Sequence, residues 1–469
     1  MKDPKNAYFV GIKGVGMTAL AVLMKQSGWN ISGSDVPNKF LTDEILQKYK
    51  IPIYETFSSN HIKASFNRVI VSGAHGGRTN IEAKTAEKLG IPVYMHGKAL
   101  GLAMKNKFSI SVAGSHGKTT TSAMVAFILE LGGLKPSYAI GTAGINKIGT
   151  AGHYGNSSYF IAEADEYMTC PVSDPTPRFL WQEPNILVVT NIEFDHPDAY
   201  KNLESVTNAF QKFTQNIKKD GLLIGNIDNP QVRTVLSKYK GSAITYGFDK
   251  SADAYIKRIE TKEGESSMTI LFRGTDIGQF SVSVPGKHNL LNALAAILVS
   301  HQVGLSWDAI RSILPRFTGT KRRFEYITKK GSVLFYDDYA HHPTEIAATI
   351  SATKQWFPRK KLTVIFQPHT YSRTKALLPE FAKAFQEADK VIITEIFPSA
   401  REKYDSTITS AMIVNEISKI KPNAIHLSTK KDVLAYLRKS VISNELIMTM
   451  GAGDVYEWHK EIKAIYERS

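Results

Sequence analysis

The sequence predicts an α/β protein of three domains, each built on a mainly parallel, doubly wound sheet. Three observations lead to this fold class. Short apolar, β-branched runs alternate with helical patterns along all 469 residues, which is typical of strand–helix–strand units. The chain is about three times as long as a common domain of roughly 150 residues. Polar stretches follow many of the expected strands, at the edge where ligands of such sheets bind.

The first domain is expected at residues 1–106. A strand at 8–12 leads into Gly14, Gly16 and Ala19, which match the dinucleotide-type spacing G-x-G-x-x-A. The next strand ends at Ser34-Asp35, where a carboxylate is placed to bind a ribose hydroxyl. Taken alone, this pattern indicates an NAD-dependent dehydrogenase. The alternative is that the glycines serve only tight packing of helix on strand.

A second loop of this domain also follows a strand. Residues 68–72 form the strand, and the loop is Gly73–Gly77. Its His75 is either a ligand contact or an ordinary loop residue, and the sequence leaves both open.

The second domain, residues 107–317, opens with the most informative stretch. A buried strand at 108–113 is followed by Gly114–Thr121, with the pattern G-x-x-G-K-T-T, and then by a helix. Strand, glycine loop and helix in this order form a phosphate cradle. Lys118 would reach the β- and γ-phosphates, and the Thr119 hydroxyl would ligate Mg²⁺. The full Walker pattern has a glycine where Val112 stands, so this loop is a shortened version.

Two acidic clusters follow apolar strands of the same domain. They are Glu163–Glu166 and Asn191–Asp198, and their oxygens are the hard ligands that Mg²⁺ prefers. Acids at strand ends are otherwise common as helix caps.

Further on, alternating segments at 254–259 and 267–272 predict an antiparallel patch. Asn289 and Asn292 lie three apart on one helical face, either for a ligand or as cap and packing residues.

The third domain is expected at residues 318–469. Strands at 333–336 and 362–366 are followed by the polar stretches 337–345 and 367–374. The adjacent pair His341-His342 has neither the spacing nor the third ligand of a zinc motif, so we expect no zinc.

Composition narrows the class of protein. The one cysteine, Cys170, excludes an intrachain disulfide and fits a reducing compartment. No apolar run approaches the roughly 20 residues of a membrane span, and Met1–Pro4 begins no signal peptide. The net charge of +15 is spread over scattered basic pairs without a basic block. We therefore expect a cytoplasmic protein without nucleic-acid or membrane partners, whose charge attracts small polyanionic substrates.

The order of these motifs resembles the Mur ligase family over essentially the whole chain. The stretches that carry the resemblance are Gly11–Met17, Gly114–Thr121, Glu163–Glu166, Asn191–Asp198, His288–Asn292, Lys321–Phe324, Asp337–Glu345, Phe366–Thr374 and Met450–Asp454. Within the family, Gln367–Arg373 and Gly451–Asp454 favour the member that adds L-alanine to UDP-N-acetylmuramate. The alternative is the recycling ligase that adds a tripeptide. More remote alternatives are a dehydrogenase and a non-catalytic UDP-sugar sensor.

The resemblance implies a role for each domain. The N-terminal domain, Rossmann-like, would bind the UDP-sugar; the central domain, similar to P-loop ATPases, would bind ATP; the Rossmann-like C-terminal domain would close over both and hold the amino acid. The implied cofactors are ATP and Mg²⁺, and the protein would be a monomer or a weak homodimer. A carboxylate would attack the γ-phosphate, and the amine of L-alanine would then displace phosphate from the acyl phosphate.

The resemblance also implies site residues. The UDP-sugar set is Gly11, Gly14, Val15, Gly16, Met17, Ser34, Asp35, Ser72 and His75. The ATP set is Gly114, Ser115, His116, Gly117, Lys118, Thr119, Thr120, Asn289, Asn292, Arg323 and Asp338. Thr119, Glu163 and His196 would hold Mg²⁺, and Arg373 and His342 the amino acid. The catalytic set is Lys118, His196, Arg323 and His342.

The chain departs from the family pattern in two places. Pro171–Trp181 is an unusual Pro-rich insertion, and the roles of its Asp174 and Arg178 are open. Several relatives carry a carboxylated lysine after the Asp-His motif. The equivalent position here is Phe210, and Lys212 lies two residues away.

Overall fold

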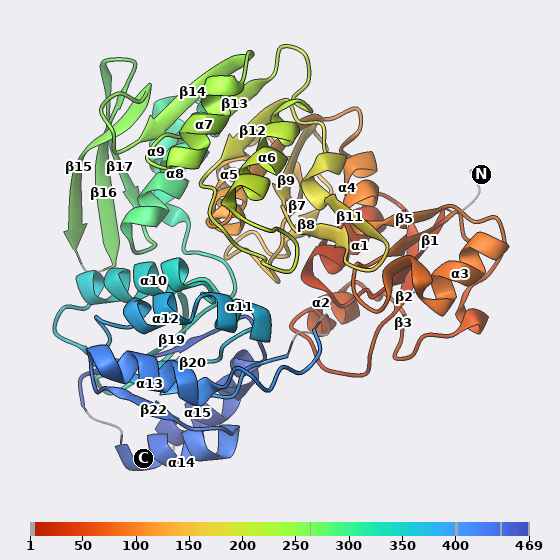
Figure 1. The fold of residues 1–469 in the computed structure, drawn as a ribbon. Helices are drawn as coiled ribbons and strands as arrows, with labels where there is room; N and C mark the ends of the chain where they lie inside the picture. The colour runs from red at the N-terminus through yellow and green to blue at the C-terminus, as the bar shows by residue number, and fades with distance from the viewer. Residues whose placement is uncertain (1–4, 263, 399–401, 441–442, 468–469) are drawn as a thin grey trace.

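The computed structural model describes residues 5–262, 264–398, 402–440 and 443–467; the Met1–Pro4 segment lies outside these ranges. Its elements form three α/β lobes, each around one large sheet (Figure 1). The N-terminal lobe lies beside the central one, and the C-terminal lobe lies below it in the view. The predicted fold class, three mainly parallel doubly wound sheets, is confirmed.

The first sheet has five parallel strands in the order β3-β2-β1-β4-β5. The strand order reverses between β1 and β4. In open α/β sheets, ligands bind in the crevice outside the carboxyl ends of the strands at such a switch point, so the loops after β1 and β4 are the expected crevice of this sheet. The strands are β1 (Asn6–Val10), β2 (Asn30–Ser34), β3 (Ile53–Tyr54), β4 (Arg68–Val71) and β5 (Val93–Met95), and the helices are α1 (Val15–Gln26), α2 (Asp43–Lys48), α3 (Ile81–Lys88) and α4 (His96–Met104).

The central sheet has ten strands in the order β17-β16-β15-β14-β13-β12-β6-β9-β7-β8. Its middle is parallel, and β16 is antiparallel to both β15 and β17, so the antiparallel patch expected from sequence is confirmed. The strands are β6 (Phe108–Ala113), β7 (Ser137–Ala139), β8 (Gly152–His153), β9 (Tyr159–Ala164), β12 (Ile186–Val189), β13 (Leu222–Asn226), β14 (Ser242–Gly247), β15 (Ala254–Lys262), β16 (Glu265–Phe272) and β17 (Thr275–Val282).

Alternating side chains of this sheet bury against opposite helical layers. Ile110 and Val188 join the core beneath α5 and α8, while Leu187 and Val189 join the core beneath α6 and α7. Both faces are therefore covered, which explains why the parallel strands read as continuous apolar runs. The helices are α5 (Lys118–Leu131), α6 (Leu203–Thr214), α7 (Pro230–Lys238), α8 (Lys287–Gln302) and α9 (Trp307–Ile313).

The third sheet has the order β18-β19-β23-β20-β21-β22 and is parallel apart from the β18–β19 hairpin. The strands are β18 (Glu325–Lys330), β19 (Val333–Asp338), β20 (Lys361–Phe366), β21 (Lys390–Ile393), β22 (Ala424–His426) and β23 (Glu445–Met450). The helices are α10 (Pro343–Trp356), α11 (Tyr371–Ala376), α12 (Leu378–Ala384), α13 (Ser410–Ile420), α14 (Lys430–Ser440) and α15 (His459–Glu467).

The Pro-rich insertion forms a small hairpin of its own. β10 (Met168–Cys170) pairs with β11 (Asp174–Pro177), and a 3₁₀ turn, η3 (Arg178–Trp181), follows. The turn η3 packs on α4 of the first lobe. Among the described residues, none of the helices combines the length and the apolar character that a membrane crossing requires.

Candidate active site

The loop between β6 and α5 has the backbone of a phosphate cradle. Gly114 and Gly117 have φ of +142° and +82°, conformations that favour glycine. A Cβ on Gly114 would lie 2.0 Å from the Thr190 hydroxyl, and one on Gly117 would lie 2.4 Å from Oδ1 of Asn292. The loop is therefore held against both Thr190 and α8, and its amides open toward the start of α5.

Lys118, the first residue of α5, folds back over this loop. Its Nζ donates to the carbonyl of Ser115 at 3.1 Å and forms an ion pair with Glu166 at 2.9 Å. Burial alone would lower the pKa of Lys118, but Glu166, Asp165 and Glu163 together outweigh burial and raise that pKa. The predicted phosphate contact of Lys118 requires its amine to exchange Glu166 for a phosphate oxygen.

Two of the three predicted magnesium ligands meet directly. The Thr119 hydroxyl donates to Oε1 of Glu163 at 3.1 Å, and the Gly141 amide donates to Oε2 at 2.8 Å. Burial raises the pKa of Glu163 despite the nearby charge of Lys118. The third predicted ligand, His196, has other partners.

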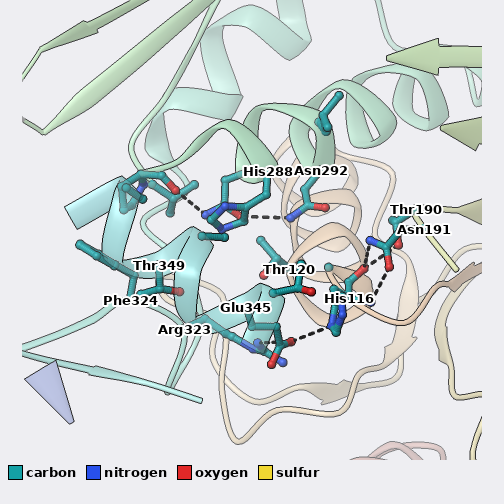
Figure 2. Close-up of a pocket in the computed structure, with 18 of the residues that line it drawn as sticks. His116, Thr120, Thr190, Asn191, His288, Asn292, Arg323, Phe324, Glu345 and Thr349 are labelled. Carbon is teal, nitrogen blue, oxygen red and sulfur yellow. Dashed lines mark hydrogen bonds and ion pairs between the residues drawn. The ribbon is translucent and has the colours of Figure 1, made fainter. Parts of the chain in front are cut away.

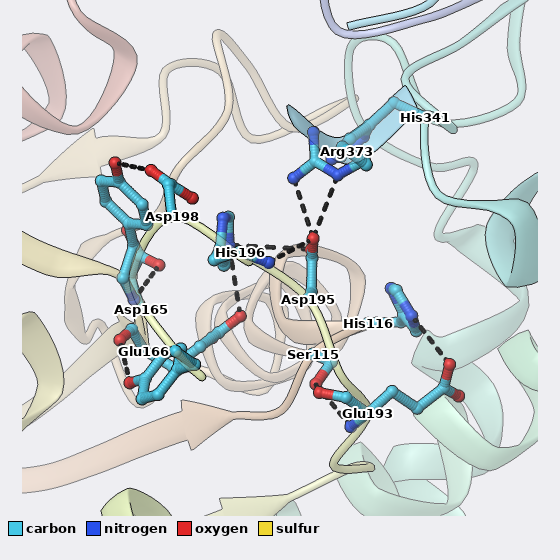
Figure 3. A network of polar contacts seen from close by, with 12 residues as sticks. Ser115, His116, Asp165, Glu166, Glu193, Asp195, His196, Asp198, His341 and Arg373 are labelled. Carbon is cyan, nitrogen blue, oxygen red and sulfur yellow. Dashed lines mark hydrogen bonds and ion pairs between the residues drawn. The ribbon is translucent and has the colours of Figure 1, made fainter. Parts of the chain in front are cut away.

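His196 stands among acids of the two clusters that the sequence analysis predicted. Its Nε2 lies 3.7 Å from both Glu166 and Asp195 (Figure 3). Its backbone φ of +57° is left-handed, and its amide donates to the Asp195 carboxylate at 2.7 Å. Ligand atoms of Asp165, Glu166 and His196 lie within 4.8 Å of one another. His196 therefore lies beside Glu166 and Asp195, and its shared role with Thr119 and Glu163 in holding Mg²⁺ stays a prediction.

A cavity between the central and C-terminal lobes collects most of the predicted ATP residues (Figure 2). The members of the predicted set that line it are His116, Gly117, Thr120, Asn289, Asn292, Arg323 and Asp338. Gly114, Ser115, Lys118 and Thr119 lie at its phosphate-loop end but are not among its lining residues. Asn289 and Asn292 are joined by a hydrogen bond of 3.0 Å, as their helical spacing predicts.

Asp338 is buried at the C-terminal end of β19. It accepts hydrogen bonds of 2.8 Å from the amides of Phe324 and Ala340. Burial raises its pKa to about 6, against the charge of Arg323. Both carboxylate oxygens are already engaged, so its predicted ribose contact would use their remaining lone pairs.

Arg323 and the phosphate-loop residue His116 share one carboxylate that sequence reasoning missed. Oε1 of Glu345 lies 3.3 Å from Nη1 of Arg323 and 3.3 Å from Nδ1 of His116. His116 also lies 3.4 Å from Glu193. Burial alone would lower the pKa of His116, but the two carboxylates raise it to about 10. Glu345 on α10 thus joins the C-terminal lobe to the phosphate loop.

Arg373 ties the same two lobes together. Its Nε and Nη2 donate to Oδ1 of Asp195 at 3.0 and 2.9 Å, with both side chains buried (Figure 3). The preceding Thr370 is a β-branched residue with φ of +71°, and its hydroxyl accepts a hydrogen bond from the Arg373 amide. Such backbone outliers cluster at functional sites.

His342 caps α10, the helix that carries Glu345. Its Nδ1 accepts a hydrogen bond from the Thr344 amide at 3.3 Å, while Nε2 is buried and has no hydrogen-bond partner among the described residues. The Nδ1 acceptor role places the proton of a neutral ring on Nε2. His342 therefore offers a hydrogen-bond donor at the interface of the two lobes.

The predicted UDP-sugar residues gather around the crevice of the first sheet. A Cβ on Gly11 would lie 2.8 Å from Ser72, and one on Gly16 would lie 3.2 Å from the His96 ring. Gly14, Val15 and Met17 form the start of α1, whose amides open toward this crevice. The loop after β1 therefore runs close to both β4 and α4.

Asp35 and His75 face each other at 3.3 Å, and Asp35 also accepts the Lys13 amide at 2.7 Å. Ser34 differs from the expectation. Its side chain is fully buried and its hydroxyl donates to Glu82, so this hydroxyl faces the interior of the domain rather than a ligand.

Known proteins share this architecture. Residues 6–108 match the Mur ligase family catalytic domain, residues 112–300 the Mur ligase middle domain, and residues 322–453 the Mur ligase glutamate ligase domain. The chain is 40% identical to the UDP-N-acetylmuramate–L-alanine ligase of Desulfitobacterium hafniense, over 97% of this chain and 98% of that one. It is 37% identical to the ligase of the same name from Caldanaerobacter subterraneus, over 97% and 96%.

Solved structures agree with this assignment. The UDP-N-acetylmuramate–alanine ligase of Thermotoga maritima superposes with a TM-score of 0.80 at 27% identity, covering 98% of this chain and 99% of that one. A murein peptide ligase from Psychrobacter arcticus, with a TM-score of 0.71 at 22% identity over 99% of both chains, shares the fold. Along nearly its whole length, the chain belongs to the Mur ligase family.

Proposed function

We propose that the protein is an ATP-dependent ligase that joins L-alanine to UDP-N-acetylmuramate, a step in the synthesis of the peptidoglycan precursor. The observation that carries this proposal is the identity of 36–40% to proteins of that name over nearly the full length of both chains. We assign the UDP-sugar to residues 1–106, ATP to residues 107–317 and the amino acid to residues 318–469. We place the reaction in the cytoplasm, carried out by a monomer or weak homodimer.

The reaction has two steps. A carboxylate oxygen of the UDP-sugar attacks the γ-phosphorus of ATP, the bond to the bridging oxygen breaks, and ADP leaves. The amine of L-alanine then adds to the acyl carbon and loses a proton, and phosphate leaves with the bonding electrons. Phosphoryl transfer depends chiefly on positioning and on neutralising charge. Lys118 and Arg323 supply fixed positive charge from two different lobes.

The donor groups near the phosphate loop fit Mg²⁺. The Thr119 hydroxyl and the Glu163 carboxylate are hard oxygen ligands 3.1 Å apart. Glu166 pairs with the neighbouring Lys118, and His196 lies 3.7 Å from Glu166. Burial raises the pKa of both Glu163 and Glu166, so a nearby dication would stabilise their ionised forms. Thr119, Glu163 and His196 would hold the ion, which would offset negative charge on the phosphates.

One experiment tests the proposal against its nearest alternative. Phosphate release is measured with ATP, Mg²⁺ and UDP-N-acetylmuramate across a panel of amino acids and short peptides. We expect L-alanine to give the highest kcat/KM. A tripeptide working better would identify a recycling ligase, and turnover without any acceptor preference would contradict both assignments.

A further inference from the structure

The Pro-rich hairpin, residues 168–181, is built into the boundary between the first two lobes. A Cβ on Gly73 would lie 2.4 Å from the Thr169 carbonyl oxygen, and one on Gly101 would lie 2.0 Å from that of Trp181. The first lobe thus has no side chain where the hairpin backbone approaches. The hairpin is consequently fixed against the loop after β4, and its η3 turn packs on α4.

The Arg178 side chain extends from this hairpin between the phosphate-loop side of the central lobe and the loop after β4 of the first lobe. The proposed reaction must connect the ligands of these two sites. Nη1 of Arg178 pairs with Asp165 at 2.7 Å, and its Nε donates to the Met168 carbonyl at 3.1 Å. Asp165 belongs to the acidic cluster with Glu166, the partner of Lys118 on the phosphate loop. One edge of the guanidinium is therefore held at the phosphate-loop side.

The other edge faces the first lobe. Nη2 lies 3.4 Å from the position of a Cβ on Gly73, which directly follows Ser72 at the crevice of the first sheet. This nitrogen has no hydrogen-bond acceptor within the described part of the chain, and the side chain is 20% exposed. The Arg178 charge also contributes, after burial, to lowering the pKa of His96, whose ring touches Gly16.

A carboxylate is the ligand that this geometry favours. In the proposed function, on which this inference rests, the lactyl carboxylate of the sugar must reach from the crevice to the γ-phosphate and approach a polyanion. A guanidinium is always charged and can bind two carboxylates through different N–H groups. Arg178 can therefore keep Asp165 on Nη1 and accept the substrate carboxylate on Nη2.

We propose that Arg178 binds and orients the lactyl carboxylate of the UDP-sugar, and thereby selects substrates that carry this carboxylate. The residue is a substrate-binding and specificity residue supplied by the Pro-rich hairpin. Asp174 of the same hairpin has a different part: its carboxylate accepts the Thr176 amide at 3.0 Å and shapes the turn.

The test compares two ligands that differ in the lactyl group. Calorimetry measures the affinity of UDP-N-acetylmuramate and of UDP-N-acetylglucosamine for wild type, Arg178→Gln and Arg178→Lys, without ATP. A charge-assisted contact predicts that Arg178→Gln loses about 10- to 100-fold in affinity for the first ligand and is unchanged for the second. Arg178→Lys, which keeps the charge, should recover part of the loss.

Lys98→Gln is the matched control, since the exposed Lys98 lies 5.2 Å from the Trp181 ring on the same interface. It should leave both affinities unchanged. Equal losses of affinity for the two ligands in Arg178→Gln, or no loss of affinity, would overturn the inference. If thermal melting shows that Arg178→Gln is unfolded, the same comparison is made with Arg178→Lys. Failure of the wild type to bind UDP-N-acetylmuramate would instead contradict the proposed function.

Discussion

The buried Arg373–Asp195 pair predicts a strong coupling between the two lobes that enclose the ATP cavity. Arg373 directs two N–H groups at one oxygen of Asp195, and the side chains are 5% and 7% exposed. Removing one partner of such a buried pair costs about 3–5 kcal/mol. Because the pair joins two lobes, we expect the cost to appear in domain closure as well as in thermal stability.

The magnitude follows from this cost. At about 1.4 kcal/mol per tenfold, Asp195→Asn and Arg373→Gln should each lower kcat/KM for ATP by roughly 100-fold or more. The double variant should lose little beyond the worse single variant, which gives a coupling energy of at least about 1.5 kcal/mol. Steady-state phosphate release on all four proteins measures the cycle, and thermal melting reports whether each variant folds.

The exposed pair Arg233–Asp249, with N–O distance 2.6 Å, is the matched control within one lobe. Its cycle should show no coupling in kcat/KM. A coupling below about 0.5 kcal/mol for Asp195 and Arg373 would refute the reasoning, because independent sites add to within that amount. Unchanged activity in either single variant would show that the pair does not contribute to closure of the two lobes.

The remaining predictions concern single groups. Lys118→Met should abolish turnover, because the loss of a desolvated phosphate contact costs on the order of 3 kcal/mol or more. Calorimetry should find the UDP-sugar affinity nearly intact; equal losses of affinity and activity would refute separate binding sites for ATP and the UDP-sugar. Arg323→Lys, which loses the fork onto phosphate and Glu345, should lower kcat strongly and ATP affinity less; unchanged kcat would make Arg323 structural. Because Phe210, which cannot be carboxylated, stands at the position where several relatives carry a carboxylated lysine, activity should not depend on dissolved carbon dioxide. If bicarbonate restored activity lost in degassed buffer, Lys212 would be implicated. Burial alone would raise the pKa of Asp195, but His196 and Arg373 hold that pKa well below its usual value. The stabilisation of the folded state by ionised Asp195 is therefore present above the ordinary carboxyl pKa of about 3.9 and is lost only as the pH falls further. If the melting midpoints of Asp195→Asn and wild type differed equally at neutral and at strongly acidic pH, this reasoning would be contradicted.

Local sequence patterns predicted the parts of the site that depend on local structure. The phosphate loop followed from a glycine spacing between strand and helix, and Asn289 and Asn292 from helical periodicity. The fold class followed from the alternation of apolar runs and helices. These features need only short-range geometry, so the sequence carries them directly.

Partners that depend on how the lobes meet were not predictable in this way. Asp195 lay inside a predicted acidic stretch, but its partner Arg373 is 178 residues away. Glu345 lay at the end of the polar stretch 337–345, yet it pairs both with Arg323 and with His116 of the central lobe. The left-handed backbone of His196 and Thr370 has no sequence signal, because such conformations are normally left to glycine or asparagine.

The transfer of an isotopically labelled oxygen tests the central claim most directly. UDP-N-acetylmuramate labelled with heavy oxygen in its lactyl carboxylate is converted with ATP and L-alanine, and the released phosphate is analysed by mass spectrometry. An acyl-phosphate route moves one carboxylate oxygen to phosphorus, so each phosphate should carry one labelled oxygen and each UDP-sugar product one alanine residue. Unlabelled phosphate, or a product without alanine, would contradict the account.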